Sequence, residues 1–199
     1  MTSPVRVSSL TGAKAQPHLD DLARLRIEVF RDFPYLYDGS LDYERRYLDN
    51  FSRSDGSVIA VAFDGDRVVG AATALPMADE PDYITAPFRA RSYDIGTIFY
   101  FGESVLLRPY RGTGIGVRFF EHREAHARSF GTYRWAAFCG VDRPPDHPLR
   151  PADYVPLDRF WQKRGFVRHP ELVSHFSWRD LGDDAETEKP MVYWLKQLT

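Results

Sequence analysis

The stretch VLLRPYRGTGIGVRFF, residues 105–120, decides the fold. An aliphatic run ends at Pro109, three alternating glycines follow, and from Ile115 to Phe130 apolar residues recur at helical spacing. This order predicts a strand, a tight turn and a helix. The glycines leave backbone N–H groups uncovered where a helix has its first unpaired donors and the positive end of its dipole. The turn is therefore predicted to bind a phosphate group.

Glycine spacing separates three kinds of phosphate-binding turn. A P-loop needs a Gly-Lys pair that does not follow Gly112, and the dinucleotide fingerprint G-x-G-x-x-G does not match a G-x-G-x-G run followed by Val117. The remaining pattern is R-G-x-G-I-G after a strand, with Arg111, Gly114 and Gly116 at its fixed positions. It resembles the acyl-CoA pyrophosphate loop of the GNAT acyltransferase superfamily. The alternative is a glycine-rich turn that only caps a helix.

The composition fits one ordinary globular domain. The 199 residues are 43% hydrophobic and 27% charged, with a net charge of -2, so neither a nucleic acid nor a membrane is expected as a partner. The single cysteine, Cys139, excludes an internal disulfide and a multi-cysteine metal site. The N-terminus has no apolar signal segment, and the chain has no 18-residue apolar run. We expect one domain over residues 1–199, soluble and cytoplasmic.

The rest of the chain alternates strand and helix patterns. A turn at residues 64–66, Asp-Gly-Asp, predicts an antiparallel hairpin between the apolar runs that flank it. The segment 76–94 is polar and broken by prolines, which predicts a connection with room for one helical turn. Strands are predicted at residues 5–10, 57–63, 67–75, 97–107, 134–141, 167–178 and 191–198, and helices at 17–30, 41–51 and 114–130.

A second motif resembles another signature of the same superfamily. Residues 157–166, LDRFWQKRGF, resemble its signature F-Y-x-K-x-G-F at a helix end, with Gly165 ending the helix. Two motifs in the expected order identify the chain as GNAT-like. The resemblance implies an α/β (α+β) fold with a central mixed, mostly antiparallel sheet, one parallel strand pair that splays apart, and helices on both faces.

The resemblance also implies an N-acetyltransferase that moves an acetyl or other acyl group from acetyl-CoA to an amine by direct attack in a ternary complex. The pantetheine arm is expected between the splayed strands and the pyrophosphate on the turn, with a backbone N–H near Leu106 or Leu107 stabilising the oxyanion. No metal is expected, because residues 122–126, HREAH, do not match H-E-x-x-H. The residues expected to bind the cofactor are Val105, Leu106, Leu107, Arg111, Gly112, Thr113, Gly114, Ile115, Gly116, Val117 and Trp161.

Glu103 is the predicted general base, because many enzymes of the superfamily carry a carboxylate on this strand. An amine with a pKa of about 10 arrives protonated and must lose a proton. Which face Glu103 occupies depends on the register, and Gly102 beside it favours a bulge that would change that face. The alternative is a buried carboxylate that is paired with Arg108 or another cation.

Trp161 departs from the family pattern. The superfamily often has a tyrosine there that protonates the departing thiolate, and an indole N–H cannot serve as that acid. Tyr154 or a water molecule would take this role, or no acid would be needed, because a CoA thiolate is a tolerable leaving group near neutral pH.

The acceptor is expected to be a small-molecule or peptide amine that contacts the loops at residues 33–38 and 142–153. Arg143 and Arg150 in the second loop are expected to set acceptor preference. Neither loop identifies the substrate, and the sequence leaves a monomer and a homodimer open. The alternative functions are a GNAT-like domain that senses acyl-CoA without turnover and, further away, a nucleotide-binding α/β domain.

Overall fold

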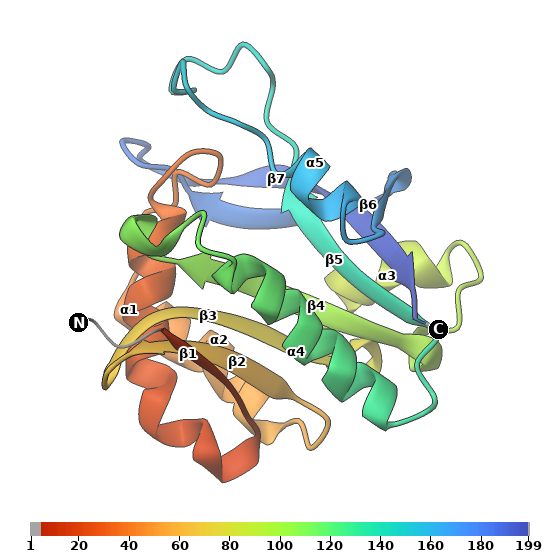
Figure 1. Cartoon of the computed structure of the whole chain (residues 1–199). Helices are drawn as coiled ribbons and strands as arrows, with labels where there is room; N and C mark the ends of the chain where they lie inside the picture. The colour runs from red at the N-terminus through yellow and green to blue at the C-terminus, as the bar shows by residue number, and fades with distance from the viewer. Residues whose placement is uncertain (1–4, 199) are drawn as a thin grey trace.

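A computed structural model describes residues 5–198, apart from the side chains of Ala13, Asn50 and Ser52. Seven strands form one mixed sheet in the order β1-β2-β3-β4-β5-β7-β6 (Figure 1). The strands are β1 Arg6–Leu10, β2 Val58–Asp64, β3 Arg67–Pro76, β4 Ile98–Leu106, β5 Trp135–Val141, β6 Val167–Arg179 and β7 Glu186–Gln197. The α-helices are α1 Leu19–Phe30, α2 Leu41–Arg53, α3 Asp82–Arg89, α4 Ile115–Ser129 and α5 Asp158–Gln162, and short 3-10 helices cover Gly12–Lys14, Gln16–His18, Met77–Asp79, Ile95–Thr97 and Arg108–Tyr110.

Helices cover both faces of the sheet. Helix α4 crosses one face over β1 to β4, whereas α1 and α2 cover β3 and β4 from the other side, and α3 packs on β6 (Figure 1). The strand, two helices and hairpin that open the chain lie where the sequence predicts them. The predicted fold class, a mixed and mostly antiparallel sheet with helices on both faces, is confirmed.

Strands β4 and β5 are the parallel pair, and they diverge after a short contact. Residues Ile98–Tyr100 pair with Trp135–Ala137, and the pairing ends there. Beyond this point β4 stays hydrogen-bonded to β3 as far as Leu106, and β5 stays bonded to β7 as far as Val141. The two strands therefore separate with the facing edge of each left without a neighbouring strand, as Figure 1 shows. This confirms the predicted splay.

Two segments differ from the sequence prediction. The connection at 76–94 contains α3, a two-turn helix that includes Pro87, because Ile84 and Phe88 are four residues apart and both are buried. Strand β7 begins at Glu186 rather than at residue 191. Pro190 does not end it, since the pairing with β6 continues on both sides of that residue.

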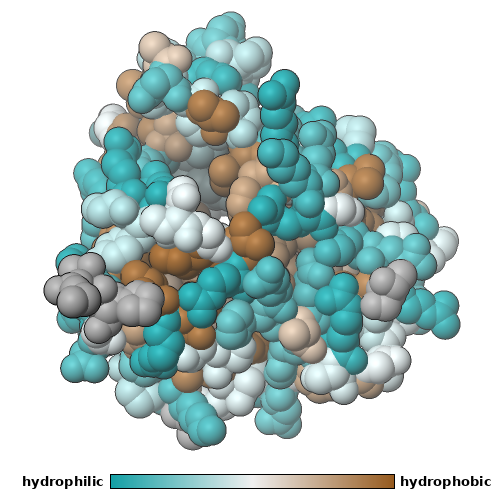
Figure 2. Space-filling model, in the orientation of Figure 1, coloured by the Kyte–Doolittle hydropathy of each residue, from teal (hydrophilic) through white to brown (hydrophobic). Residues whose placement is uncertain are grey.

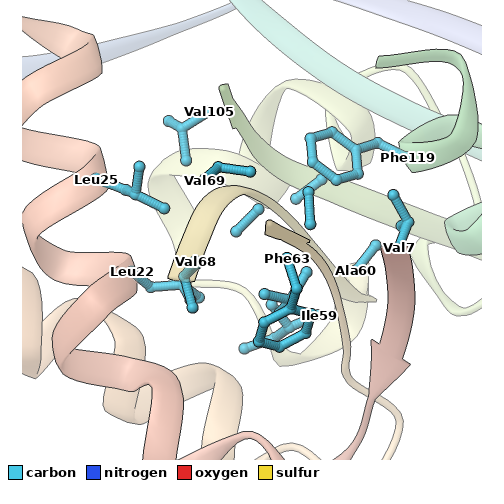
Figure 3. Close-up of a cluster of buried hydrophobic side chains, with 14 of the residues drawn as sticks. Val7, Leu22, Leu25, Ile59, Ala60, Phe63, Val68, Val69, Val105 and Phe119 are labelled. Atoms are coloured by element: carbon cyan, nitrogen blue, oxygen red, sulfur yellow. The ribbon is translucent and has the colours of Figure 1, made fainter. Parts of the chain in front are cut away.

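The apolar core on the α1 side determines which side chains of β4 face α1. In Figure 3, Leu22 and Leu25 of α1 face Val68 and Val69 of β3, and Val105 of β4 points into the same cluster. Tight packing of this kind sets the face of each β4 residue. Within residues 5–198, no helix combines the length and the apolar character needed to cross a membrane.

Candidate active site

A cleft of about 1580 Å³ opens where β4 and β5 diverge. Its walls include the two strands, the first turn of α4 and α5, together with α1, α2 and the segment 33–37. In Figure 2 the molecule is hollowed below the loop that follows β5, and apolar atoms show at the edge of the hollow. Because α4 and α1 lie on opposite faces of the sheet, the cleft passes from one face to the other.

The glycine-rich turn forms one end of the cleft. Gly112 and Gly114 have φ angles of 78° and 88°, a region that L side chains rarely adopt. Within the described chain, no hydrogen bond engages the backbone N–H groups of residues 112–116, whereas Val117 and Arg118 both donate to the carbonyl of Gly114. Successive free donors at a helix N-terminus form an anion-binding site.

Arg111 and Thr113 stabilise this turn. The Nε of Arg111 donates to the carbonyl of Leu106 at 3.0 Å, and its terminal nitrogen lies 3.3 Å from Asp32. The hydroxyl of Thr113 donates to the carbonyl of Tyr110 at 2.7 Å, so this side chain closes the turn. Arg111 stays partly exposed and lines the cleft, where a cation can meet a phosphate.

The predicted cofactor residues divide into two groups, apart from Thr113, which is exposed and does not line the cleft. Val105, Leu107 and Ile115 are buried in the core, so only their backbone can meet a ligand. Those that line the cleft are Leu106, Arg111, Gly112, Gly114, Gly116, Val117 and Trp161.

The backbone of β4 narrows the choice of oxyanion donor. The N–H of Leu107 donates to the carbonyl of Val69 at 3.0 Å and is not free. Because successive N–H groups of a strand point to opposite edges, those of Ser104 and Leu106 point toward the edge that β5 has left. Of the two residues predicted to donate to the oxyanion, Leu106 has a backbone N–H that points toward the gap between the strands. The N–H of Leu107 is already hydrogen-bonded, so it cannot be that donor.

A β-bulge turns Glu103 toward α1 and α2. Gly102 and Glu103 together lie opposite Thr73, and the N–H of Glu103 donates to the Thr73 hydroxyl at 3.2 Å. A side chain at Gly102 would place its Cβ 2.5 Å from the same hydroxyl oxygen, so only glycine fits. This is the bulge that Gly102 favours in the sequence. Ser104, the next residue, faces α4.

Glu103 belongs to a buried ionic network and also lines the cleft. Its carboxylate lies 2.7 Å from Arg26 of α1 and accepts a hydrogen bond from the hydroxyl of Tyr47 at 3.1 Å. Arg26 also donates to Glu44, which is fully buried, and stacks 4.1 Å from the Tyr47 ring centre. Burial alone would lower the pKa of Arg26, but Glu103, Tyr47 and Glu44 outweigh burial and raise it. The buried cation that pairs with Glu103 is Arg26. Arg108, the cation named in the sequence analysis, pairs with Asp32 instead.

Arg123 of α4 lies buried beneath the bulge and is only 1% exposed. Its guanidinium donates to the carbonyl of Glu103 at 3.3 Å and to the hydroxyl of Ser104 at 2.9 Å, between the rings of Phe101 and Phe120. Burial lowers the pKa of Arg123 to about 9, so it stays protonated at neutral pH. Arg123 therefore ties the bulge to α4.

The two aromatic residues predicted near the leaving group occupy different walls. Trp161 packs against Phe138 and Trp194, with ring centres 5.0 Å and 5.1 Å away, and lines the cleft from α5. Tyr154 lies half-buried in the loop after β5, edge-on to Phe33 at 4.7 Å, and also lines the cleft. Burial raises the pKa of Tyr154, which keeps its hydroxyl protonated.

Two other residues at or near the cleft are not free to react or to bind a ligand. Arg143 donates to the carbonyls of Pro34 and Tyr35 and pairs with Asp180 at 2.7 Å, so it holds the segment 33–37 in place. Burial raises the pKa of the Cys139 thiol to about 12, which leaves it un-ionised at neutral pH. Among residues 5–198, no group of three or more His, Cys, Asp or Glu side chains is arranged to hold a metal ion.

Glu80, between β3 and α3, is a buried carboxyl group close to this site. It is 8% exposed, and its Oε1 atom has no hydrogen-bond partner among the described residues. Burial, together with the charges of Glu103 and Asp79, raises the pKa of Glu80 to about 8. Glu80 also interacts electrostatically with Tyr47 and Tyr83, both of which line the cleft.

Sequence reasoning misses the charged residues that surround Glu103. Each is a charged residue within the apolar face of a helix, which is a detectable signal because such residues are rarely buried without a partner. Arg26, Glu44 and Arg123 each lie four residues from a buried apolar residue of the same helix, respectively Leu22, Leu48 and Phe119.

Comparisons with known proteins agree with this fold. A family model described as the acetyltransferase (GNAT) family matches residues 22–151. A ribosomal-protein-alanine N-acetyltransferase from Brucella melitensis has a similar structure, with a TM-score of 0.61 and 15% identity over 97% of this chain and 99% of that chain. An N-acetyltransferase from Staphylococcus aureus Mu50 gives a TM-score of 0.62 and 13% identity over 99% of this chain and 100% of that one.

A third similar structure contains a ligand. It is yncA from Salmonella typhimurium with its cofactor acetyl-CoA, and it gives a TM-score of 0.62 and 10% identity over 99% of this chain and 95% of that one. At such identities these likenesses show the fold alone. A search of curated proteins found no match.

Proposed function

Because the chain belongs to the GNAT acetyltransferase family, we propose that it transfers an acetyl group from acetyl-CoA to an amine by direct attack in a ternary complex. The observation that carries the proposal is one continuous cleft that joins the free N–H groups of residues 112–116 to the carboxylate of Glu103. The turn would hold the pyrophosphate, and the free edges of β4 and β5 would pair with the pantetheine arm as an added strand does.

Three residues are assigned roles in the transfer. The N–H of Leu106 would stabilise the oxyanion that forms when the amine nitrogen attacks the thioester carbon. Glu103 would take the proton from the amine, and Tyr154 or a water molecule would protonate the sulfur as the carbon–sulfur bond breaks. Direct attack needs no nucleophile from the protein, which agrees with the un-ionised thiol of Cys139.

The test is a panel of amines incubated with acetyl-CoA and the purified protein, with free thiol as the measured product. Thiol release that depends on both the protein and an amine is the expected result. Acetyl-CoA binding without thiol release for every amine would favour an acyl-CoA sensor instead. Failure to bind CoA, or binding of ATP in preference, would favour a plain nucleotide-binding domain.

Gly114→Val is expected to weaken CoA binding by about tenfold or more, measured by calorimetry. Gly114 has a φ of 88° and no neighbour within 4 Å of an added Cβ, so the loss would come from a changed backbone rather than from a clash inside the protein. Gly182→Val is the matched control, because Gly182 has the same φ and the same open surroundings in the turn between β6 and β7. Unchanged affinity in a folded Gly114→Val protein would show that the turn does not bind CoA.

A further inference from the structure

One end of the cleft is walled mainly by aromatic rings. They come from the segment 33–37, α2, α3 and β6, so four separate parts of the chain contribute to one surface. The rings that matter here are Tyr35, Tyr37, Tyr43, Tyr47, Tyr83 and Trp178. Aromatic faces are electron-rich, and they attract organic cations while also burying apolar carbon.

Few cations are available to a ligand at this end. Arg26 lies between two carboxylates, Glu44 and Glu103, and pairs with both. Arg143 and Lys189 lie against the Trp178 ring at 5.8 Å and 4.9 Å, but neither lines the cleft.

Both of those cations are already occupied. Arg143 and Lys189 share the carboxylate of Asp180, at 2.7 Å and 3.2 Å, and both also donate to backbone carbonyls. On the opposite face, Arg123 donates to the carbonyls of the bulge. Arg143 and Lys189 are therefore not available to Glu103, whereas Arg123 also interacts with the charge of Glu103.

Glu80 adds a third carboxyl group, and one of its oxygens, Oε1, has no hydrogen-bond partner among the described residues. This oxygen is buried, and Glu80 interacts electrostatically with Glu103 and with the cleft residues Tyr47, Tyr83 and Tyr100. A buried carboxyl group without a partner is costly unless a ligand completes its surroundings. An ammonium group would do so, and its positive charge would favour the ionised form of Glu80.

We infer that this end of the cleft takes a compact organic cation, a primary amine carried on an aromatic or apolar body without a carboxylate. Its ammonium group would be held by Glu103 and by Glu80, which the free protein keeps protonated and which would ionise as the ammonium binds. The inference rests on the proposed function, since it names the acceptor class of the same cleft. A carboxylate on the acceptor would meet the negative charge of Glu103, and a neutral analogue would not favour the ionised form of Glu80.

Three probes that share one phenyl-ethyl skeleton test the inference. They are phenethylamine, phenylalanine, which adds a carboxylate, and 2-phenylethanol, which replaces the ammonium with a hydroxyl. Calorimetry with CoA present is expected to give phenethylamine a Kd at least about tenfold below those of the other two, the ratio that one charge-assisted contact provides. Equal or tighter binding of phenylalanine or of 2-phenylethanol would overturn the inference.

Glu80→Gln tests the assigned residue. The amide is nearly isosteric with the carboxyl, so the fold should be kept, and the Kd and KM for phenethylamine are expected to rise about tenfold while the KM for acetyl-CoA stays within about twofold. Glu121→Gln on the exposed side of α4 is the control and should change neither constant. An unchanged Kd for phenethylamine in folded Glu80→Gln would remove Glu80 from the site.

The two proposals can fail separately. If phenethylamine binds selectively and Glu80→Gln weakens it, yet no amine releases thiol from acetyl-CoA, then the binding inference holds and the transferase proposal fails. If thiol is released with phenylalanine as readily as with phenethylamine, then the transferase proposal holds and the inference about the acceptor fails.

Discussion

Replacing Glu103 with glutamine is expected to lower kcat at neutral pH by about 10²- to 10⁴-fold while acetyl-CoA binding stays nearly unchanged. Glu103 is the carboxylate that lines the cleft at the bulge, so it is placed to take a proton from an arriving ammonium. Glutamine keeps the size of the side chain but cannot accept that proton. The loss should shrink as the pH approaches the pKa of the amine, about 10, because the substrate then arrives already deprotonated.

Glu44→Gln is the matched control for this experiment. Glu44 pairs with the same Arg26 but does not line the cleft, so its replacement disturbs the ionic network without touching the proposed proton acceptor. We expect a much smaller change in kcat and no change in the shape of the pH profile. Equal losses in both variants would mean that Glu103 acts only through Arg26, as a structural carboxylate.

The glycine-rich turn could be predicted from sequence because its requirement is local. Positive φ angles at Gly112 and Gly114 restrict those positions to glycine, and the helix that follows shows its period within the same stretch. Gly102 also marks the bulge in the sequence, although the Thr73 hydroxyl that excludes a side chain there lies on the neighbouring strand β3. The splay of β4 and β5 could be predicted only from the family resemblance, because no residue pattern marks the point where two strands stop pairing.

The surroundings of Glu103 could not be predicted, since they depend on contacts between distant parts of the chain. Arg26 lies on α1 and Tyr47 on α2, and only the packing of both helices against β4 brings them to the carboxylate. The same holds for Leu107, whose backbone N–H donates a hydrogen bond to the carbonyl of Val69 on β3. A strand pattern shows which edge a donor faces only after the partner strands and their register are known.

Glu80 was missed for a different reason. It lies in the polar, proline-broken segment that the sequence describes as a connection, where a charged residue is ordinarily exposed. The segment contains α3, which packs on β6, and Glu80 just before this helix is only 8% exposed. A glutamate at a helix boundary carries no local sign of this burial.

Glu80→Gln is also expected to raise the free energy of unfolding near pH 8 and to leave it nearly unchanged below pH 4.5. The native state holds the pKa of Glu80 at about 8, whereas an unfolded chain releases this proton near the ordinary value of 4.5. Between these values the native protein binds the proton and the unfolded chain does not, so wild-type stability falls as the pH rises from 4.5 to 8. The pKa difference corresponds to at most about 5 kcal/mol.

The other groups near Glu80 do not produce this pH dependence. Glu103 and Asp79 both raise the pKa of Glu80 and are carboxylates in either variant, while burial raises the pKa values of Tyr47, Tyr83, Tyr100, Tyr193 and Cys139, which stay neutral over this range. Urea unfolding of the wild type, Glu80→Gln and the exposed control Glu121→Gln at pH 5 and pH 8 measures the effect. A gap between wild type and Glu80→Gln that is the same at both pH values would mean that Glu80 is already ionised in the native protein.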